Sequence, residues 1–87
     1  MARYELRIRP SVAKDLRGVP RTDVRRILAC IEALRDDPRP PGSEKLSGQE
    51  RYRLRQGHYR ILYSVLDAEL IVEVVKVGHR RDVYRDR

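Results

Sequence analysis

The chain has 87 residues, a length that fits one small domain with a modest hydrophobic core. Its net charge is +7, from 20 Lys and Arg against 13 Asp and Glu, which favours polyanions or an acidic protein as partners. The single cysteine, Cys30, excludes an internal disulfide, and no stretch approaches the run of about 18 apolar residues of a membrane helix. The N-terminus also lacks the apolar segment of a signal peptide, so we expect a cytoplasmic protein.

The N-terminal half predicts one strand followed by two helices. Apolar and charged residues alternate over 4–8, the period of two that is typical of a half-buried strand. Pro10 and Ser11 end this strand, and Ser11 is expected to be the N-cap of a short helix. From about 22 to 36, apolar residues recur every three or four positions, which predicts a longer helix with one apolar stripe, beside which Cys30 should pack. The two helices should form a hairpin across a sheet.

The C-terminal half predicts three strands. A proline-rich loop at 37–43 precedes them. The hydrophobic period then changes to two, and short turns at 56–58 and 67–69 imply antiparallel hairpins. Gly78 is expected to end the sheet, ahead of a polar tail with one helical turn. The expected fold is a single α+β domain over 1–87, an antiparallel sheet packed against a helical hairpin in the order β-α-α-β-β-β with a short helix at the end. The three strands are expected at 51–55, 59–66 and 70–77.

Arginines are concentrated in the segment 51–60, which carries four of them and no acidic residue. Strand geometry places Arg51, Arg53 and Arg55 on one face, about 6.5–7 Å apart, a spacing similar to that of successive phosphates along an extended nucleic-acid strand. Three like charges in a row repel one another unless an anion or an acidic partner lies beside them. The alternative is a solvated polar face, which alternating strands present routinely.

A second basic cluster, 78–85, follows the last predicted strand and contains His79, Arg80 and Tyr84. Antiparallel pairing places the end of the last strand beside the start of the strand before it, so this cluster should approach Arg60. Other catalytic patterns are missing from the sequence: zinc-ligand spacing, a glycine-rich phosphate loop, a serine nucleophile elbow and an acidic cluster for two metals. We therefore expect neither a metal nor a cofactor.

The two basic segments together resemble the core of the RelE/ParE toxin superfamily of type II toxin–antitoxin systems. The resemblance is carried by 52–63 and 74–84, with further similarity at 37–38 and 45–48, and it extends over essentially the whole chain. RelE-like members cleave mRNA in the decoding site of the ribosome, whereas ParE-like members poison DNA gyrase without being nucleases. The positions that match a RelE-like nuclease site are Arg53, Arg55, Arg60, Arg80 and Tyr84.

The resemblance implies metal-independent cleavage in which the 2′-OH of the RNA attacks the adjacent phosphorus. Arg60 would stabilise the phosphorane, Arg80 would assist the departing 5′-oxygen, and Tyr84 would stack a base or orient the 2′-OH. Flanking phosphates would be held by Arg51, Arg53, Arg55 and Lys45. Arginine keeps its proton near neutral pH and is a poor general base, so His79, rather than His58 in the turn, is the candidate for acid–base chemistry.

Three alternatives stay open: a gyrase inhibitor without chemistry of its own, an RNA-binding module without catalysis, and an inactive toxin. The superfamily also implies an antitoxin encoded nearby, whose acidic or amphipathic segment would neutralise arginines and cover apolar surface. Operator DNA would be contacted only through the toxin–antitoxin complex. The expected substrate is mRNA on the ribosome, and no membrane association is expected.

Overall fold

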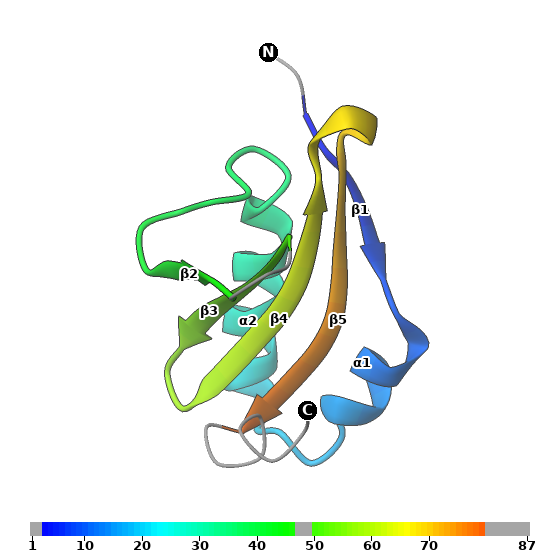
Figure 1. The fold of residues 1–87 in the computed structure, drawn as a ribbon. Coiled ribbons are helices and arrows are strands. Elements are labelled where there is room, and N and C mark those ends of the chain that lie inside the picture. The colour runs from blue at the N-terminus through cyan, green and yellow to red at the C-terminus, as the bar shows by residue number, and fades with distance from the viewer. Residues whose placement is uncertain (1–2, 47–49, 80–87) are drawn as a thin grey trace.

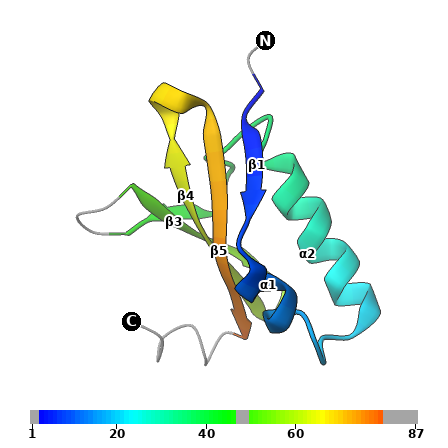
Figure 2. The ribbon, with the colours of Figure 1, turned by 90° about the vertical axis from the view of Figure 1, so that its right-hand side faces the viewer.

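The structure is a computed structural model that describes residues 3–46 and 50–79. The described elements are β1 (Glu5–Ile8), α1 (Pro10–Asp15), α2 (Arg21–Ala33), β2 (Ser43–Lys45), β3 (Arg51–Gln56), β4 (Tyr59–Leu66), η1 (Asp67–Glu69) and β5 (Ile71–His79). The strands form one sheet in the order β1-β5-β4-β3-β2. In Figure 1 one face of this sheet is turned to the viewer and α2 lies behind it; Figure 2, turned by 90°, shows α2 running along the other face. The predicted α+β class is confirmed.

One strand pair corrects the expectation of a purely antiparallel sheet. The pairs β2–β3, β3–β4 and β4–β5 are antiparallel, but β1 runs parallel to β5, with Glu5 opposite Ile71 and Ile8 opposite Val74. Hydrophobic alternation predicts which face of a strand is buried and says nothing of its direction. Since most of the chain separates β1 from β5, no short turn determines their relative direction either.

Two details at helix and loop ends were also predicted wrongly. The short helix begins at Pro10, a residue favoured in the first turn, with Arg9 as its N-cap. Ser11 lies inside the helix, and its hydroxyl donates to the carbonyl of Val75 at 3.4 Å. The loop before β3 contains the short strand β2, where Ser43 pairs with Leu54. A strand of three residues is too short to show a period of two, so the sequence pattern could not indicate it.

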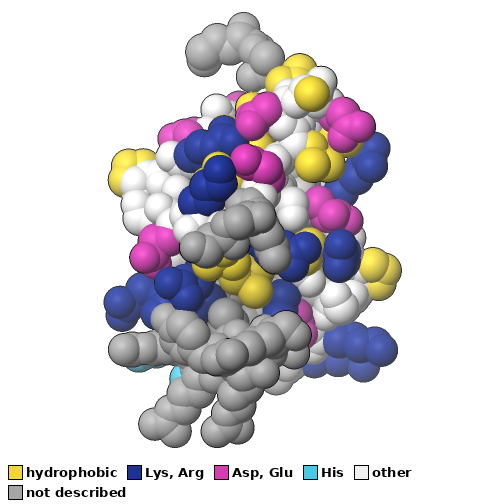
Figure 3. Space-filling view, viewed as in Figure 1, with side chains coloured by type: hydrophobic (Ala, Val, Ile, Leu, Met, Phe, Trp, Pro, Cys, Tyr) yellow, Lys and Arg dark blue, Asp and Glu magenta, His cyan; other side chains and the backbone are white. Residues whose placement is uncertain are grey.

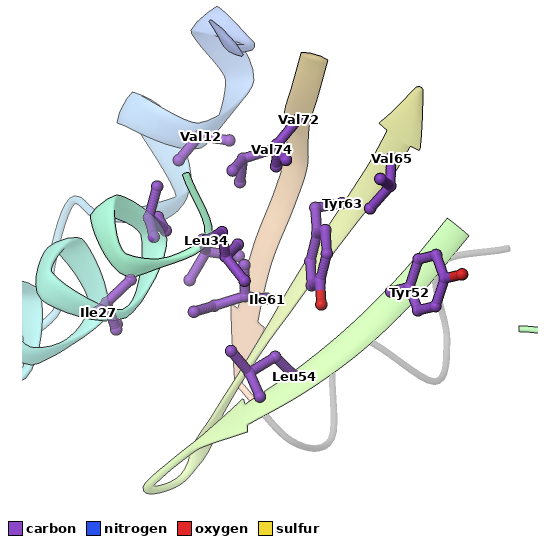
Figure 4. Close-up of a cluster of buried hydrophobic side chains, with 12 residues drawn as sticks. Val12, Ile27, Leu34, Tyr52, Leu54, Ile61, Tyr63, Val65, Val72 and Val74 are labelled. Atoms are coloured by element: carbon purple, nitrogen blue, oxygen red, sulfur yellow. The ribbon is translucent and has the colours of Figure 1, made fainter. Parts of the chain in front are cut away.

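The hydrophobic core lies between the helices and one face of the sheet (Figure 4). The apolar stripe of α2 buries Ile27 and Ile31, and α1 adds Val12. Cys30 packs against this core as expected; its thiol donates to Oε1 of Gln56 at 2.8 Å, and burial raises its pKa. Among the described residues, neither helix is both long and apolar enough to cross a membrane. The sheet contributes Tyr52, Leu54, Ile61, Tyr63, Val65, Val72, Val74 and Val77.

Tyr63 links the core to the loop that follows α2. Its ring is fully buried and stacks on Tyr52, with ring centroids 5.7 Å apart. Its hydroxyl donates to the carbonyl of Pro38 at 2.8 Å, and burial raises its pKa to about 12. The phenol therefore stays protonated, and stays a hydrogen-bond donor, over the whole physiological pH range.

Tyr63→Phe is expected to lower the free energy of unfolding by about 1–3 kcal/mol, because the buried Pro38 carbonyl would lose its donor. Urea unfolding followed by circular dichroism measures this change. Tyr59→Phe is the matched control, since no hydrogen bond of the Tyr59 hydroxyl is found within the described ranges. Equal stability of the Tyr63→Phe variant and the unmodified protein would show that this hydrogen bond does not stabilise the fold.

A second link joins the loop before β2 to the turn between β4 and β5. Arg39 donates through Nη1 and Nη2 to both carboxylate oxygens of Asp67, at 3.2 and 2.7 Å, and through Nε to the hydroxyl of Tyr52 at 2.8 Å. The hydroxyl of Tyr4 donates to the same carboxylate at 2.7 Å. These hydrogen bonds, that of Arg39 first, lower the pKa of Asp67, and the carboxylate raises the pKa of Arg39.

Asp67→Asn is expected to lower the melting temperature at pH 7, and the difference from the unmodified protein should shrink in acid. The folded-state pKa of Asp67 lies below its unfolded value of about 3.9. The stabilisation is therefore present above that pH and is lost as the pH falls through the folded-state pKa. Melting curves between pH 7 and pH 3 test this, with Glu69→Gln in the same turn as the charge-matched control. A difference that does not depend on pH would contradict the ionic role of Asp67.

Candidate functional site

The sheet face turned away from the helices carries a set of basic side chains in adjacent rows. Strand register places Arg55 opposite Arg60 and Arg60 opposite Gly78, while Arg53 lies opposite Leu62. We call this surface the arginine face. Its basic members are Arg51, Arg53 and Arg55 from β3, Arg60 from β4 and Lys76 from β5. The structure thus brings the three arginines of β3 onto one face, as predicted, and places Arg60 beside them.

Arg60 is the most buried charged residue of this face, with 8% of its surface exposed. It is directly opposed to Arg55 across the β3–β4 ladder. Like charges in directly opposed positions destabilise a sheet, and the cost rises where one of them is withdrawn from water. An arrangement of this kind suits a site that receives an anion between the two guanidinium groups.

Acidic side chains contact the arginine face at its margins. Glu44 of β2 accepts from Nη2 of Arg53 at 3.1 Å, and Oδ1 of Asp15 in α1 lies 3.8 Å from Nζ of Lys76. Nε of Arg51 is buried without a hydrogen-bond partner among the described residues. Figure 3 shows this face: dark-blue Lys and Arg lie in its lower half on both sides of a hydrophobic patch, and the upper half carries dark-blue and magenta groups side by side. Basic side chains therefore predominate in the lower half of this view.

Lys76 is the member of this face that the sequence analysis did not assign to the site. The β4–β5 register shifts between Leu62 and Tyr63, so that Tyr63 pairs with Val74 but Leu62 pairs with Lys76. Val75 is the extra residue of this bulge. In a regular strand without the bulge, Lys76 would point to the same side as Val74, which is the side of the core. The doubled valine at 74–75 was the available signal, because it interrupts the alternation of β5.

The structure does not bring all predicted residues to this face. Lys45 pairs with Tyr52, in a row that faces the helices, and its ammonium forms an ion pair with Glu50 at 3.1 Å. His79 pairs with Tyr59, also in a row of the helix side, and its ring contacts Tyr59 edge to face with centroids 5.7 Å apart. The ring of His58 stacks on His79 at 6.3 Å. The imidazole of His79 thus lies on the opposite side of the sheet from Arg60.

Arg80 and Tyr84 lie outside the described residues, so their predicted roles stay predictions. Gly78 does not end the sheet as expected; β5 continues to His79, and Gly78 pairs with Arg60. The expected approach of the last strand to Arg60 is therefore confirmed as far as Gly78. Within 3–46 and 50–79, no group of three or more His, Cys, Asp or Glu side chains is arranged to hold a metal ion.

Comparison with known proteins identifies the family. A family model described as the ParE toxin of the type II toxin–antitoxin system parDE matches residues 6–84. The chain belongs to the RelE/ParE superfamily of toxins. The toxin RelG of Mycobacterium tuberculosis is 31% identical over 90 residues, which cover 94% of this chain and 97% of RelG. A candidate RelE toxin of Methanocaldococcus jannaschii is 28% identical over 97% of this chain and 98% of its own length.

Solved structures of RelE toxins share the fold of this superfamily member. A chain of the archaeal RelE–RelB complex of Pyrococcus horikoshii superposes with a TM-score of 0.78 and 29% sequence identity, covering 92% of this chain and 97% of that chain. The predicted superfamily is therefore confirmed, and with it the coarse function: this RelE/ParE chain is a toxin of a type II toxin–antitoxin system.

Proposed function

We propose that this toxin is an endoribonuclease that cleaves mRNA, with the ribosome as the place of cleavage. The observation that carries the proposal is the opposition of the buried Arg60 to Arg55 on the arginine face. The relatives named RelE-like or RelG point to the same branch of the superfamily.

The chemistry follows from what guanidinium groups can do. The 2′-oxygen attacks the adjacent phosphorus, the bond from phosphorus to the 5′-oxygen breaks, and a 2′,3′-cyclic phosphate forms. The phosphorane between these states carries more negative charge than the substrate, and Arg60, already withdrawn from water, would stabilise that extra charge with its forked donors. Arg51, Arg53 and Arg55 lie along β3 at a spacing that suits flanking phosphates.

The predicted protein partner is an antitoxin. Several solved structures of RelE relatives are complexes with the antitoxin RelB, including those of Pyrococcus horikoshii and Methanococcus jannaschii. A partner with an acidic segment would offset the repulsion along β3 and would compete with RNA for the same arginines. Contacts with operator DNA would then be made through the complex.

The second candidate function is inhibition of DNA gyrase. It is favoured by one observation, the match of residues 6–84 to the family model described as ParE toxin. Such a toxin would need the basic face only to bind a partner. A toxin that only binds gyrase would gain nothing from burying the guanidinium of Arg60 beside that of Arg55.

A parallel assay separates the two candidates. The purified toxin would be added to ribosomes programmed with an mRNA, to the same mRNA alone, and to gyrase with relaxed plasmid. The proposal predicts new RNA ends with ribosomes and unchanged supercoiling. Inhibited supercoiling with intact RNA would establish the gyrase inhibitor, and binding of RNA with neither effect would establish a module without catalysis.

A further inference from the structure

We infer that Lys76 is the residue that gives a proton to the 5′-oxygen as it leaves, and that Asp15 positions it. The inference rests on the proposed nuclease function. Arginines account for phosphate binding and charge stabilisation but exchange protons poorly near neutral pH, and the imidazole of His79 lies on the helix side of the sheet. Arg80, which the resemblance assigns to the departing 5′-oxygen, is a guanidinium and would give up a proton poorly, so an ammonium group on the arginine face would supply that proton.

A bulge in β5 determines the face to which Lys76 points. The extra residue Val75 turns Lys76 onto the arginine face while Val77 returns to the core with 2% exposure. Bulges are common beside active sites, where they redirect a side chain. Lys76 lies opposite Leu62, and Arg60 is the diagonal neighbour of Lys76 at a Cα separation of about 7–8 Å, which long side chains span. A phosphate bound by Arg60 therefore lies within reach of the ammonium.

Asp15 is held against β5 by the position of its helix and by a hydrogen bond from the backbone of β5. Helix α1 lies against β5 where β1 ends: the amide of Arg9 donates to the carbonyl of Val74 at 3.0 Å. The last residue of the helix, Asp15, accepts the amide of Val77 on Oδ2 at 3.0 Å. Its other oxygen, Oδ1, lies 3.8 Å from Nζ of Lys76. The backbone hydrogen bond thus orients the carboxylate, and the carboxylate attracts the ammonium.

The pair formed by Lys76 and Asp15 lies in a partly buried position. Both side chains are largely withdrawn from water, with 26% of Lys76 and 19% of Asp15 exposed. A pocket of about 400 Å³ lies beside the pair, and its lining includes Asp15, Lys76 and Gly78 together with Tyr59 and His79. Of these lining residues, Gly78 lies in the row of Arg60.

The step balances in atoms and charge. The bond from O2′ to phosphorus forms, the bond from phosphorus to O5′ breaks, and one proton moves from Nζ of Lys76 to O5′. The proton of the 2′-OH goes to water, and the neutral amine is protonated again by solvent. Lys76 is thereby a catalytic residue and Asp15 a positioning residue.

The test compares two substrates on programmed ribosomes: the ordinary mRNA, and the same mRNA with sulfur in place of the 5′-oxygen at the cleaved bond. A thiolate leaves without protonation. Lys76→Ala should slow cleavage of the oxygen substrate roughly a hundredfold. On the sulfur substrate, the cleavage rate of this variant should lie within a few fold of the rate of the unmodified toxin. Lys76→Arg, which keeps the charge, should show the same pattern. Asp15→Asn keeps an acceptor for the amide of Val77. It should slow cleavage of the oxygen substrate about tenfold and leave the cleavage rate of the sulfur substrate near that of the unmodified toxin.

Lys14→Ala is the matched control, because Lys14 is exposed on the same helix, and it should cleave both substrates at the unmodified rate. Melting curves confirm that each variant is folded. An unchanged cleavage rate of the Lys76→Ala variant on the oxygen substrate would overturn the inference. An equal loss of rate on both substrates would also overturn it and would assign Lys76 to charge stabilisation or folding. If the unmodified toxin cleaved neither substrate, the nuclease function itself would fail, which is a separate outcome.

Discussion

Arg60→Ala is expected to lower the single-turnover rate of mRNA cleavage on programmed ribosomes by about 10²–10³-fold, the usual loss when one donor to a developing anion is removed. Arg60 is the residue of the arginine face with the smallest exposure, and it is opposed to Arg55. Because Arg60 would act mainly on the charge that develops in the transition state, the affinity for RNA should change much less than the rate.

Two variants make this result interpretable. Arg60→Lys keeps a positive charge but loses the forked donors, so its rate should fall between those of the alanine variant and the unmodified toxin. Arg26→Ala removes an exposed arginine of α2, on the other side of the sheet, and should leave the rate unchanged. A folded Arg60→Ala variant with an unchanged rate would remove Arg60 from the chemistry. A loss confined to affinity would make it a phosphate-binding residue only.

The combined replacement of Arg51, Arg53 and Arg55 by glutamine is expected to weaken binding of single-stranded RNA by about 10²–10³-fold at low salt. Each guanidinium would release counterions from one phosphate. The slope of log affinity against log salt should therefore become shallower by about 2, since each phosphate contact on a single strand contributes roughly 0.7. Fluorescence anisotropy with a labelled oligonucleotide at several salt concentrations measures both quantities.

The matched control replaces Arg21, Arg25 and Arg26 by glutamine. These three arginines are exposed on α2, so the control has the same net charge as the β3 variant but an intact arginine face. It should bind RNA within a few fold of the unmodified toxin. Equal weakening in both triple variants would mean that net charge alone attracts RNA, and the arginine face would then have no special role in binding.

Periodicity was sufficient to predict the parts of the fold that repeat along the chain. The strand expected at 59–66 is β4, and the apolar stripe of the long helix buries Ile27 and Ile31 as predicted. The parallel direction of β1 depends on a partner far along the chain, and β2 is too short to have a period. Both features arise from tertiary contacts, which a local pattern does not contain.

In the candidate site, too, the local sequence pattern predicts some placements and tertiary contacts determine others. The placement of Arg51, Arg53 and Arg55 on one face follows from strand alternation, and the structure agrees. Strand alternation did not place Lys76 on this face, because a bulge in β5 changes the side to which Lys76 points. The bulge is visible only in the pairing of β5 with β4. His79 lies in the row of Tyr59 on the helix side, whereas the adjacent Gly78 lies in the row of Arg60, because successive residues of a strand point to opposite faces.

The chemical identity of the RNA ends tests the central claim most directly. Ribosomes programmed with a defined mRNA would be treated with the purified toxin, and both fragments would be analysed by mass spectrometry. Cleavage by the 2′-OH predicts an upstream fragment that ends in a 2′,3′-cyclic phosphate or 3′-phosphate and a downstream fragment that begins with a 5′-hydroxyl. Intact mRNA, or fragments with a 3′-hydroxyl and a 5′-phosphate, would contradict it.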